Sequence, residues 1–312
     1  MEPRVTVLLP THNRADVLGY AIRSVLWQTE QDFELLIVGD GCTDNTADVV
    51  ASFQDARIRW FGLPKAPLSG YANRNIALRG ARGRYVAYAQ HDDIWFPDHL
   101  ERLVTAIEAS GTDWVYSLPL WVMPDGVVIL GLVNLTHHDE LDHFLHVENR
   151  IPSTFVMHSR HALERVGYWP ENIAHIADWR CWQRIITTSR SRTAGYCAVP
   201  TALHFCAAGT RRTPLMELRW RSTERSALPQ SCRIAVSCGE TEQRCFFDTL
   251  APEPCAWIDQ VRAAIPDIIG RQARAWAAAL ESEFHISESR WNSRSALVRQ
   301  LVWTLFRKSW PR

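Results

Sequence analysis

Residues 5–41 read VTVLLPTHNRADVLGYAIRSVLWQTEQDFELLIVGDG. The apolar run at 5–9 predicts a short strand that ends at Pro10, because proline has no N–H to donate to a strand ladder. Residues 17–27 place apolar side chains at helical spacing, and 33–38 predict a second strand before the turn-forming Gly39-Asp40-Gly41. The stretch therefore predicts a strand, a helix and a second strand in succession.

The same alternation continues to residue 89. Strands are expected at 57–62 and 85–89, and helices at 46–53 and 73–80. Repeated strand–helix units predict an α/β fold, with a Rossmann-like, mostly parallel sheet flanked by helices. Ligands of such sheets bind at the carboxyl ends of the strands.

The alternation fades after about residue 130, so a mixed sheet with longer loops is the expected continuation. A boundary is predicted near residue 210, between a domain of residues 1–210 and a mainly helical region of residues 211–312. The remaining elements expected beyond residue 120 are a strand at 127–133, a histidine-rich loop that begins at 137, and helices at 267–284 and 293–308.

Composition excludes several protein classes. The 312 residues hold 34 Lys+Arg against 34 Asp+Glu, so no general affinity for nucleic acid is expected. The eight cysteines form no C-x-x-C pair, which argues against a structural zinc site and for reduced thiols in the cytoplasm. No run reaches the ~18 apolar residues of a membrane span, and the N-terminus lacks the pattern of a signal peptide. A cytoplasmic location is therefore predicted.

Polar residues follow the predicted strands where those strands end. They are residues 11–14 after the first strand, Asp40 after the second, and Gln90-His91-Asp92-Asp93 after the fourth. The first strand–helix turn has no G-x-G-x-x-G, and the chain has no G-x-x-x-x-G-K-[ST]. A bound nucleotide would therefore be held by side chains, not by a glycine-rich loop.

Four stretches, in order, carry a family resemblance: residues 7–14, 36–44, 73–77 and 85–100. Together they resemble the inverting glycosyltransferases of family 2, which have the GT-A fold of nucleotide-diphospho-sugar enzymes. The resemblance covers roughly residues 4–205. Within that family, residues 85–100 and 156–158 are especially similar to the bacterial spore-coat polysaccharide glycosyltransferase.

The resemblance implies a donor site for a nucleotide sugar, formed by Pro10, Thr11, His12, Asn13, Asp40, Arg74, His91 and Asp92. Asp40 has the family position of a carboxylate that accepts a hydrogen bond from the base. It is alternatively a turn residue before the next helix. Thr11 and His12 would line the base pocket, or else belong to a solvated loop. Arg74 would reach the base or a phosphate, or else be a solvated helix residue.

The resemblance also implies a divalent metal ion, Mg²⁺ or Mn²⁺, at Asp92. Such ions prefer oxygen ligands and bind through carboxylates together with substrate phosphates. The family motif usually begins with an acidic residue where this chain has Gln90, and His91 would then contact ribose or phosphate. Asp93 is expected to order the following turn, and a turn or capping role is the alternative for Asp92.

Asp178 has the family position of the catalytic base, ahead of an aromatic helix. In an inverting transfer, one carboxylate accepts the proton of the attacking hydroxyl. The alternative for Asp178 is the N-cap of the helix at Trp179.

His204 is either close to the diphosphate or a partly buried core histidine. A cluster of four further histidines contains no H-x-x-x-H pair, which indicates an acceptor-side loop and not a metal site. These are His137, His138, His143 and His146.

The resulting prediction is an inverting glycosyltransferase that moves a sugar from a UDP-, dTDP- or GDP-sugar to a glycan, lipid-linked or small-molecule hydroxyl. The alternative is a non-catalytic GT-A module that binds nucleotide sugar or scaffolds glycan assembly. Residues 293–308 form a basic amphipathic pattern. That pattern suits peripheral contact with the inner face of the plasma membrane, or packing on the chain's own domain or on a second copy in a homodimer.

Overall fold

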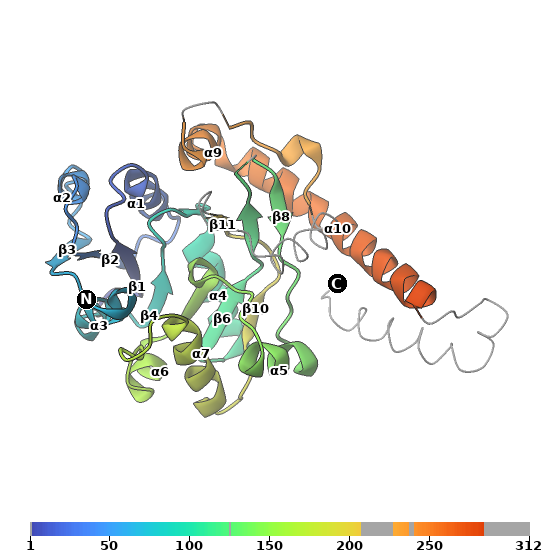
Figure 1. The fold of residues 1–312 in the computed structure, drawn as a ribbon, viewed down its shortest axis with the longest axis horizontal. Coiled ribbons are helices and arrows are strands. Elements are labelled where there is room, and N and C mark those ends of the chain that lie inside the picture. Colours follow the sequence, from blue (N-terminus) through green and yellow to red (C-terminus); the bar gives the residue numbers. More distant parts are fainter. Residues whose placement is uncertain (1, 125, 207–226, 237–239, 284–312) are drawn as a thin grey trace.

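The computed structural model describes residues 2–124, 126–206, 227–236 and 240–283 (Figure 1). Its central sheet has seven strands, and β1 pairs in parallel with β2 on one side and β4 on the other. The strands in pairing order are β10 (Gly195–Cys197), β6 (Trp114–Ser117), β9 (Val156–Ser159), β4 (Tyr85–Tyr88), β1 (Val5–Thr11), β2 (Phe33–Asp40) and β3 (Ile58–Leu63).

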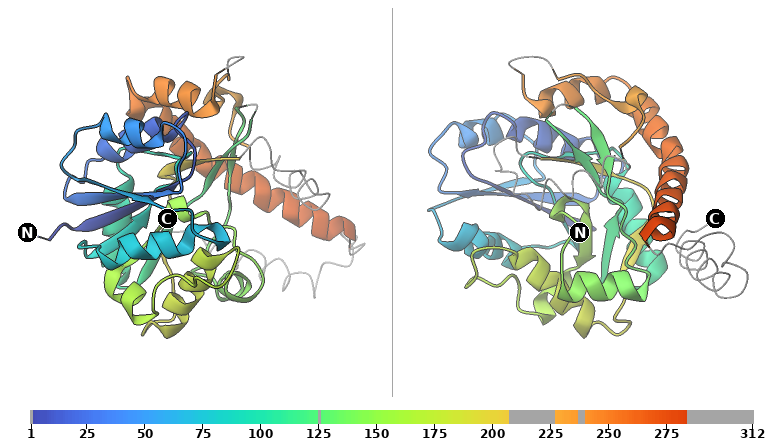
Figure 2. Two further views of the ribbon diagram at one scale, coloured as in Figure 1. Left: turned by 60° about the vertical axis from the view of Figure 1, so that its left-hand side comes forward. Right: turned by 45° about the vertical axis from the view of Figure 1, so that its right-hand side comes forward.

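The central sheet is mixed but mostly parallel, as predicted. Only β9 runs antiparallel to its two neighbours, β4 and β6, while β3 and β10 pair in parallel with β2 and β6. Every residue of β1 and β2 is buried, as expected for central parallel strands covered on both faces. Figures 1 and 2 show α1 and α2 on one side of the β1–β3 part of the sheet and α3 on the other.

The helices of this part of the chain include the three that the pattern predicts before residue 89, with ends that differ by at most two residues. The helices are α1 (Leu18–Leu26), α2 (Thr46–Ala51), α3 (Tyr71–Arg79), α4 (His99–Ser110), α5 (His138–His146), α6 (Arg160–Arg165) and α7 (Ala177–Thr188). Short 3-10 turns are η1 (Leu68–Gly70), η2 (Ser153–Phe155) and η4 (Gln230–Cys232).

The predicted strand end at Pro10 is wrong, because β1 continues to Thr11. Pairing with β4 stops at Leu8, whose carbonyl accepts the Ala89 amide, whereas pairing with β2 continues through Pro10. Pro10 faces the same side as Leu8, so its missing N–H falls where no ladder bond is needed.

β2 likewise extends past residue 38 to Asp40, and so includes the first two residues of the predicted turn. Gly39 belongs to the strand because it pairs with Thr11 of β1 and Gly62 of β3, and it faces the indole of Trp60. A Cβ at Gly39 would lie 2.3 Å from the Trp60 ring. Another prediction that fails is the histidine-rich loop, since His138–His146 form α5. Its apolar side is provided by Phe144, which is buried against Trp114 and Trp179.

A second, smaller sheet contains strands that lie far apart in the sequence. Its order is β5 (Ile94–Trp95), β11 (Ala202–Phe205), β7 (Leu120–Val122) and β8 (Val128–Leu130). β8 lies inside the strand predicted at 127–133. The other pairings join segments separated by about a hundred residues, which local periodicity does not reveal.

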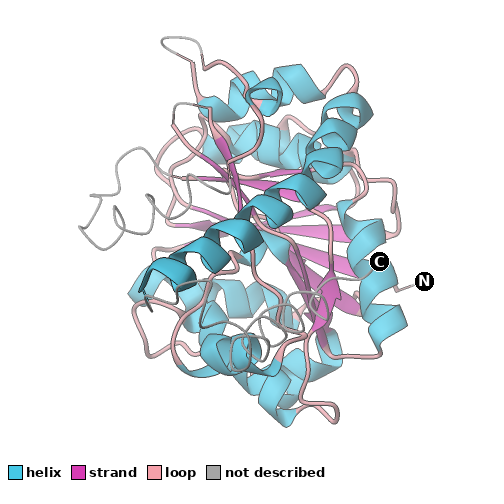
Figure 3. Ribbon diagram, turned by 90° about the vertical axis from the view of Figure 1, so that its right-hand side faces the viewer, coloured by secondary structure: helices cyan, strands magenta, loops and turns pink. Residues whose placement is uncertain are grey.

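Two C-terminal helices, α9 (Glu242–Leu250) and α10 (Pro254–Glu283), pack on the second sheet. Phe246 packs edge-on against Phe205 of β11, and Trp257 packs edge-on against Phe96. Figure 3 shows α10 running diagonally past the strands. The predicted helical C-terminal region is confirmed for these residues, and α10 contains most of the helix predicted at 267–284.

Two predictions fall on residues that the structure does not describe. The boundary near residue 210 lies within 207–226, so the division into 1–210 and 211–312 stays a prediction. The helix predicted at 293–308 also lies outside the described residues. Among the helices that are described, none has both the length and the apolar character needed to cross a membrane.

Candidate active site

The carboxyl ends of β1, β2 and β4 lie side by side and bring together residues that the sequence separates. Thr11 ends β1, Asp40 ends β2, and the motif at 90–93 follows β4. Strand order places β1 between the other two. This edge of the sheet is therefore the candidate site, as the strand–helix alternation predicts.

The Asp40 carboxylate is buried and held in a fixed orientation. Its Oδ1 accepts the Ala66 amide at 2.8 Å and the Asn73 amide group at 2.7 Å, and its Oδ2 accepts Lys65 Nζ at 2.7 Å. Burial alone would raise the pKa of Asp40, but these donors hold it below its ordinary value. An ionised carboxylate offers about four acceptor positions, so one position on Oδ2 stays available to a ligand.

A run of left-handed backbone forms the wall beside Asp40. Leu68, Ser69 and Gly70 have φ of 53°, 65° and 73°. A Cβ at Gly70 would lie 2.5 Å from Asp40 Oδ2, so glycine keeps that side of the carboxylate open. Left-handed φ in residues other than glycine stores strain, which is common at ligand sites.

Arg74 is partly enclosed, unlike the solvated helix residue that was the alternative. Its guanidinium carbon lies 4.9 Å from the Tyr71 ring centre and 5.6 Å from that of Trp169. Nη1 donates to the Ser69 carbonyl at 2.7 Å, whereas Nε is buried without a hydrogen-bond partner. The Arg74 guanidinium therefore keeps at least one N–H, at Nε, that donates no hydrogen bond.

Arg74 also links Asp40 to Asp178 electrostatically. Burial lowers the pKa of Arg74, and the nearby Tyr71, Asp178 and Asp40 oppose that shift. Arg74 therefore lies close enough to both predicted functional carboxylates for their charges to act on it. Near Asp178, Ser69 Oγ donates to the Ala174 carbonyl at 2.7 Å and connects the wall beside Asp40 to the segment before α7.

Asp178 lies in the first turn of α7. The N-cap is Ile176, a β-branched residue with φ of 60°. The alternative role of Asp178 as the N-cap of this helix is therefore wrong, because Asp178 lies two residues after the N-cap. The Asp178 carboxylate accepts the Trp179 amide at 2.8 Å. Burial raises the pKa of Asp178, and the Trp179 amide and Arg74 oppose the shift. A raised pKa brings a carboxylate closer to the range in which it accepts protons well.

Asp92 presents a partly exposed carboxylate at the end of β4. Arg14 Nη1 lies 3.3 Å from its Oδ2 and His91 Nε2 lies 3.6 Å away. The other ring nitrogen of His91 lies 3.2 Å from the Pro10 carbonyl, which anchors the imidazole at the end of β1. The Asp92 backbone carbonyl accepts Gln243 Nε2 from α9 at 3.1 Å.

Gln90 and Asp93, which flank His91 and Asp92, bind to other parts of the fold. Asp93 is 2% exposed and lies 3.0 Å from His204 Nδ1 on β11, whose neighbour Phe205 donates its amide to Asp93. Burial would lower the pKa of His204, but the Asp93 carboxylate raises it. Asp93 thus ties the motif to the second sheet, whereas the sequence predicts that it orders the next turn. Gln90 Nε2 donates to Ser153 Oγ at 2.5 Å.

The residues around Asp92 could hold a divalent cation only if a bound substrate supplied further ligand atoms. In the described ranges, no three His, Cys, Asp or Glu side chains gather into a metal-holding group. Asp92 supplies one carboxylate, its side chain is 21% exposed, and Arg14 offsets its charge. Mg²⁺ is commonly held by one or two carboxylates together with substrate phosphates. These residues therefore fit a cation that binds with a diphosphate.

The remaining predicted residues surround the end of β1. Thr11 is buried and its Oγ1 has no hydrogen-bond partner. His12 and Asn13 are exposed, and Asn13 accepts the Thr43 amide at 2.8 Å. Thr11 pairs with Gly39, the residue before Asp40, and its unpaired buried hydroxyl is a polar group that a bound ligand would satisfy.

Three residues of the site are missing from the sequence prediction. Asn73 and Lys65 fix Asp40, and Gln243 holds the backbone at Asp92. One signal was available for Lys65, because it and Lys308 are the only lysines among 34 basic residues. No local pattern points to Gln243, which lies about 150 residues after Asp92.

Residues 6–128 match the family model of glycosyl transferase family 2. This stretch, which holds β1 to β4 and the motif at 90–93, is similar to glycosyl transferase family 2. Among curated relatives, the Escherichia coli UDP-Glc:alpha-D-GlcNAc-diphosphoundecaprenol beta-1,3-glucosyltransferase WfgD is 34% identical over 112 residues, or 36% of this chain and 44% of WfgD. The putative teichuronic acid biosynthesis glycosyltransferase TuaG of Bacillus subtilis is 38% identical over 103 residues, or 32% of this chain and 40% of TuaG. The chain thus matches less than half the length of either relative.

Solved structures confirm the GT-A type of fold. S. aureus TarS 1-349 in complex with UDP-GlcNAc superimposes with a TM-score of 0.53 at 16% identity, over 66% of this chain and 59% of TarS 1-349. The mannosyltransferase PcManGT from Pyrobaculum calidifontis, in complex with GDP-Man and Mn2+, has a TM-score of 0.50 at 17% identity, over 99% of this chain and 88% of PcManGT. At these identities, the likeness concerns the fold alone.

Proposed function

We propose that this protein is an inverting glycosyltransferase that moves a sugar from a nucleotide-diphosphate donor to an acceptor hydroxyl. The observation that carries the proposal is that the wall beside Asp40 is joined to the segment before Asp178 by the bond from Ser69 to Ala174, with the Arg74 guanidinium bound to the same wall. One carboxylate is held ionised by fixed donors, and burial raises the pKa of the other. These are the properties that recognition of a base and acceptance of a proton require.

Asp40 binds the base of the donor in this proposal. Its free acceptor position takes one N–H of a base such as uracil, and Gly70 leaves the space for it. Thr11 Oγ1 supplies a further polar contact. TarS 1-349 binds UDP-GlcNAc and PcManGT binds GDP-Man, which supports a nucleotide-sugar donor.

The diphosphate is bound between Asp92, His91 and Arg14. Mn²⁺ or Mg²⁺ held by Asp92 would neutralise the charge of the leaving diphosphate. The complex of PcManGT with GDP-Man and Mn2+ supports the use of a divalent cation, and the exposed Asp92 carboxylate is the residue that we propose for it. Arg14, 3.3 Å from Asp92, keeps a positive charge at the same edge, and the Arg74 guanidinium retains a buried N–H for an oxygen of the donor.

Asp178 accepts the proton of the acceptor hydroxyl. As the new bond from the acceptor oxygen to the anomeric carbon forms, the bond from that carbon to the diphosphate oxygen breaks, and the leaving nucleoside diphosphate takes the electron pair. Attack from the opposite face inverts the anomeric carbon. Burial of Asp178 raises its pKa and so favours proton uptake, while Arg74 keeps the carboxylate ionised beforehand.

Asp178→Asn tests the proposal and separates it from a non-catalytic donor-binding module. We expect Asp178→Asn to bind nucleoside diphosphate as the wild type does and to lose about 10²–10⁴-fold in sugar transfer, the range of general-base catalysis. The measurement is release of nucleoside diphosphate from UDP-glucose, UDP-GlcNAc, dTDP-glucose and GDP-mannose. Asp48→Asn, at an exposed position on α2, is the matched control. Binding without release in the wild type would instead support the non-catalytic module.

A further inference from the structure

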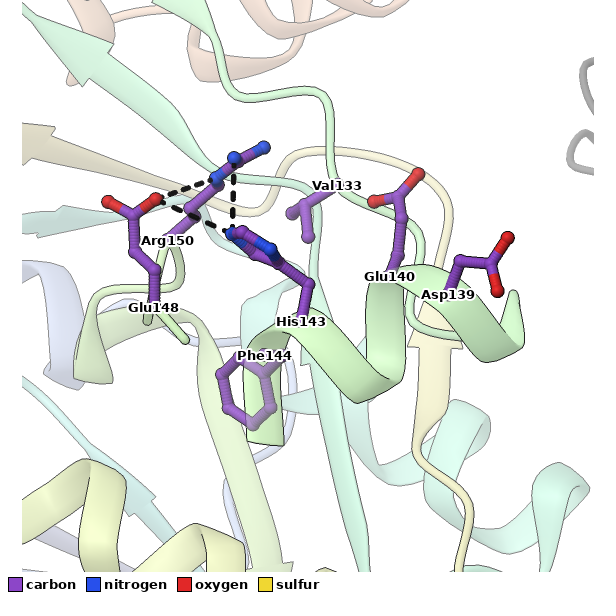
Figure 4. A pocket seen from close by; sticks show the side chains of 7 residues that line it. All are labelled: Val133, Asp139, Glu140, His143, Phe144, Glu148 and Arg150. Atoms are coloured by element: carbon purple, nitrogen blue, oxygen red, sulfur yellow. Dashed lines mark hydrogen bonds and ion pairs between the residues drawn. The ribbon is translucent and has the colours of Figure 1, made fainter. Parts of the chain in front are cut away.

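A cavity of about 250 Å³ lies against one side of α5 and the segment that follows it. Figure 4 shows His143, Glu148 and Arg150 converging at one end of the cavity, with Asp139 and Glu140 at the other. Pockets for drug-sized ligands have volumes of ~300–1,000 Å³, so this cavity suits a smaller ligand, of the size of one sugar ring.

The polar lining both donates and accepts hydrogen bonds. Arg150 Nε lies 3.3 Å from the Glu148 carboxylate, and His143 Nε2 lies 3.7 Å from the same group. Arg150 Nη2 is 3.4 Å from His143 Nε2. Each sugar hydroxyl can donate and accept, so carboxylates, a guanidinium and an imidazole around one space match its needs.

The cavity lies next to the helix that carries Asp178. Trp179 Nε1 donates to the Phe144 carbonyl at 2.7 Å, and Gln183 Nε2 donates to the Leu145 carbonyl at 2.6 Å. Phe144, which lines the cavity, packs edge-on against Trp179. The C-terminal end of α5 is therefore fixed to the first two turns of α7, beginning one residue after Asp178.

The chain segment that follows Arg150 contacts the motif at 90–93. Arg150 is followed by the turn η2, in which Ser153 Oγ accepts Gln90 Nε2 at 2.5 Å. Gln90 begins the motif that contains Asp92. The segment that lines the cavity is thus fixed at one end to the helix of Asp178 and at the other to the motif of Asp92.

We propose that this cavity is an acceptor subsite that binds a neutral sugar ring of a glycan acceptor. The proposal rests on the proposed function and names its acceptor class. Three carboxylates against one arginine and one histidine give the lining an acidic balance, which disfavours a phosphate group of the acceptor at this position. The subsite therefore recognises the sugar next to the reacting hydroxyl, and any phosphate lies elsewhere.

Saturation-transfer NMR on the full chain tests the subsite, with methyl β-D-glucopyranoside, methyl α-D-mannopyranoside and phenyl phosphate as probes. We expect signal transfer to at least one methyl glycoside, no transfer to phenyl phosphate, and at least a fivefold weaker signal in both His143→Ala and Arg150→Ala. Both side chains are partly exposed, so both variants should fold. His146→Ala, on the same helix but outside the cavity, is the matched control and should behave as the wild type.

The two proposals fail in different ways. Absence of glycoside binding, equal binding in the cavity variants, or preferred binding of phenyl phosphate would overturn the subsite. None of these outcomes affects the release of nucleoside diphosphate from a sugar donor. Conversely, glycoside binding that both cavity variants lose, in a protein that releases no nucleoside diphosphate from the four donors, would retain a sugar-binding cavity and reject the transferase.

Discussion

The substitution Gln243→Leu should weaken donor binding, although Gln243 lies on α9, beyond the residues 6–128 that match the family model. Gln243 is 6% exposed on α9 and donates to the Asp92 carbonyl at 3.1 Å. α9 is itself fixed to the first helix, because Phe247 stacks on Trp27 with ring centres 5.1 Å apart and an interplanar angle of 15°. The amide is therefore a rigid support for the backbone of the motif.

The size of the effect follows from the bond. A neutral hydrogen bond contributes about 1 kcal/mol net, and a buried partner left unpaired costs about 1–3 kcal/mol. Leucine has a similar volume, so the substitution leaves no large cavity. A 1.4 kcal/mol change is about tenfold in affinity, so a loss of about 1 kcal/mol predicts about fivefold weaker binding of UDP with Mn²⁺.

Titration calorimetry with UDP and Mn²⁺ measures the affinity, and thermal unfolding measures stability. Gln183→Leu is the matched control, because it removes an amide-to-carbonyl bond of the same kind between α7 and Leu145. We expect both variants to lose a similar amount of stability and only Gln243→Leu to lose affinity for UDP. Equal affinities in the two variants would show that the bond merely stabilises the fold and would refute the supporting role of α9.

Three further predictions concern the donor edge and the base. Asp92→Asn should abolish the part of UDP affinity that depends on Mn²⁺, measured by calorimetry with and without the metal; retained metal dependence would contradict the assignment. Asp40→Ala should raise the donor KM about tenfold or more with little change in kcat, since a hydrogen bond to a charged group contributes about 1.5–3 kcal/mol; unchanged KM would return Asp40 to a turn role. Arg74→Met removes a cation that lowers the pKa of Asp178, so the base stays protonated to higher pH and the acid limb of kcat/KM should move to higher pH. Arg79→Met, on the same helix, should leave that limb in place, and an unmoved limb in Arg74→Met would exclude Asp178 as the titrating base.

The sequence predicts the strands and helices of residues 1–89 well because the signals there are local. β1 and β2 are short apolar runs, and Asp40 and Asp92 follow strands that pair with a common neighbour. Even so, adjacent carboxylates have different surroundings. Asp92 is partly exposed beside Arg14, whereas Asp93 is buried against His204. Neither the spacing of apolar residues nor intrinsic propensity distinguishes Asp92 from Asp93, because the difference arises from His204 on β11, more than a hundred residues away.

The second sheet and the helix α5 were harder to predict for a related reason. β5 has two residues and pairs with β11 through Trp95 and Ala202, so no periodic pattern marks it. The histidines of α5 are poor evidence for a helix, and Phe144 is its one fully buried residue. Its stability comes from packing on Trp114 and Trp179, which tertiary structure alone provides.

The motif at 90–93 is thus supplied by one part of the chain and oriented by another. Residues 6–128 match the family and contain the motif, yet Ser153 binds Gln90, Gln243 binds the Asp92 carbonyl, and His204 binds Asp93. Each of these partners comes from a different element, respectively η2, α9 and β11. Because the acidic residue expected at position 90 is a glutamine that bonds to Ser153, the geometry of the single remaining carboxylate at Asp92 depends on all three. The similarity to the family therefore covers the residues of this motif, whereas residues beyond 128 fix how those residues are oriented.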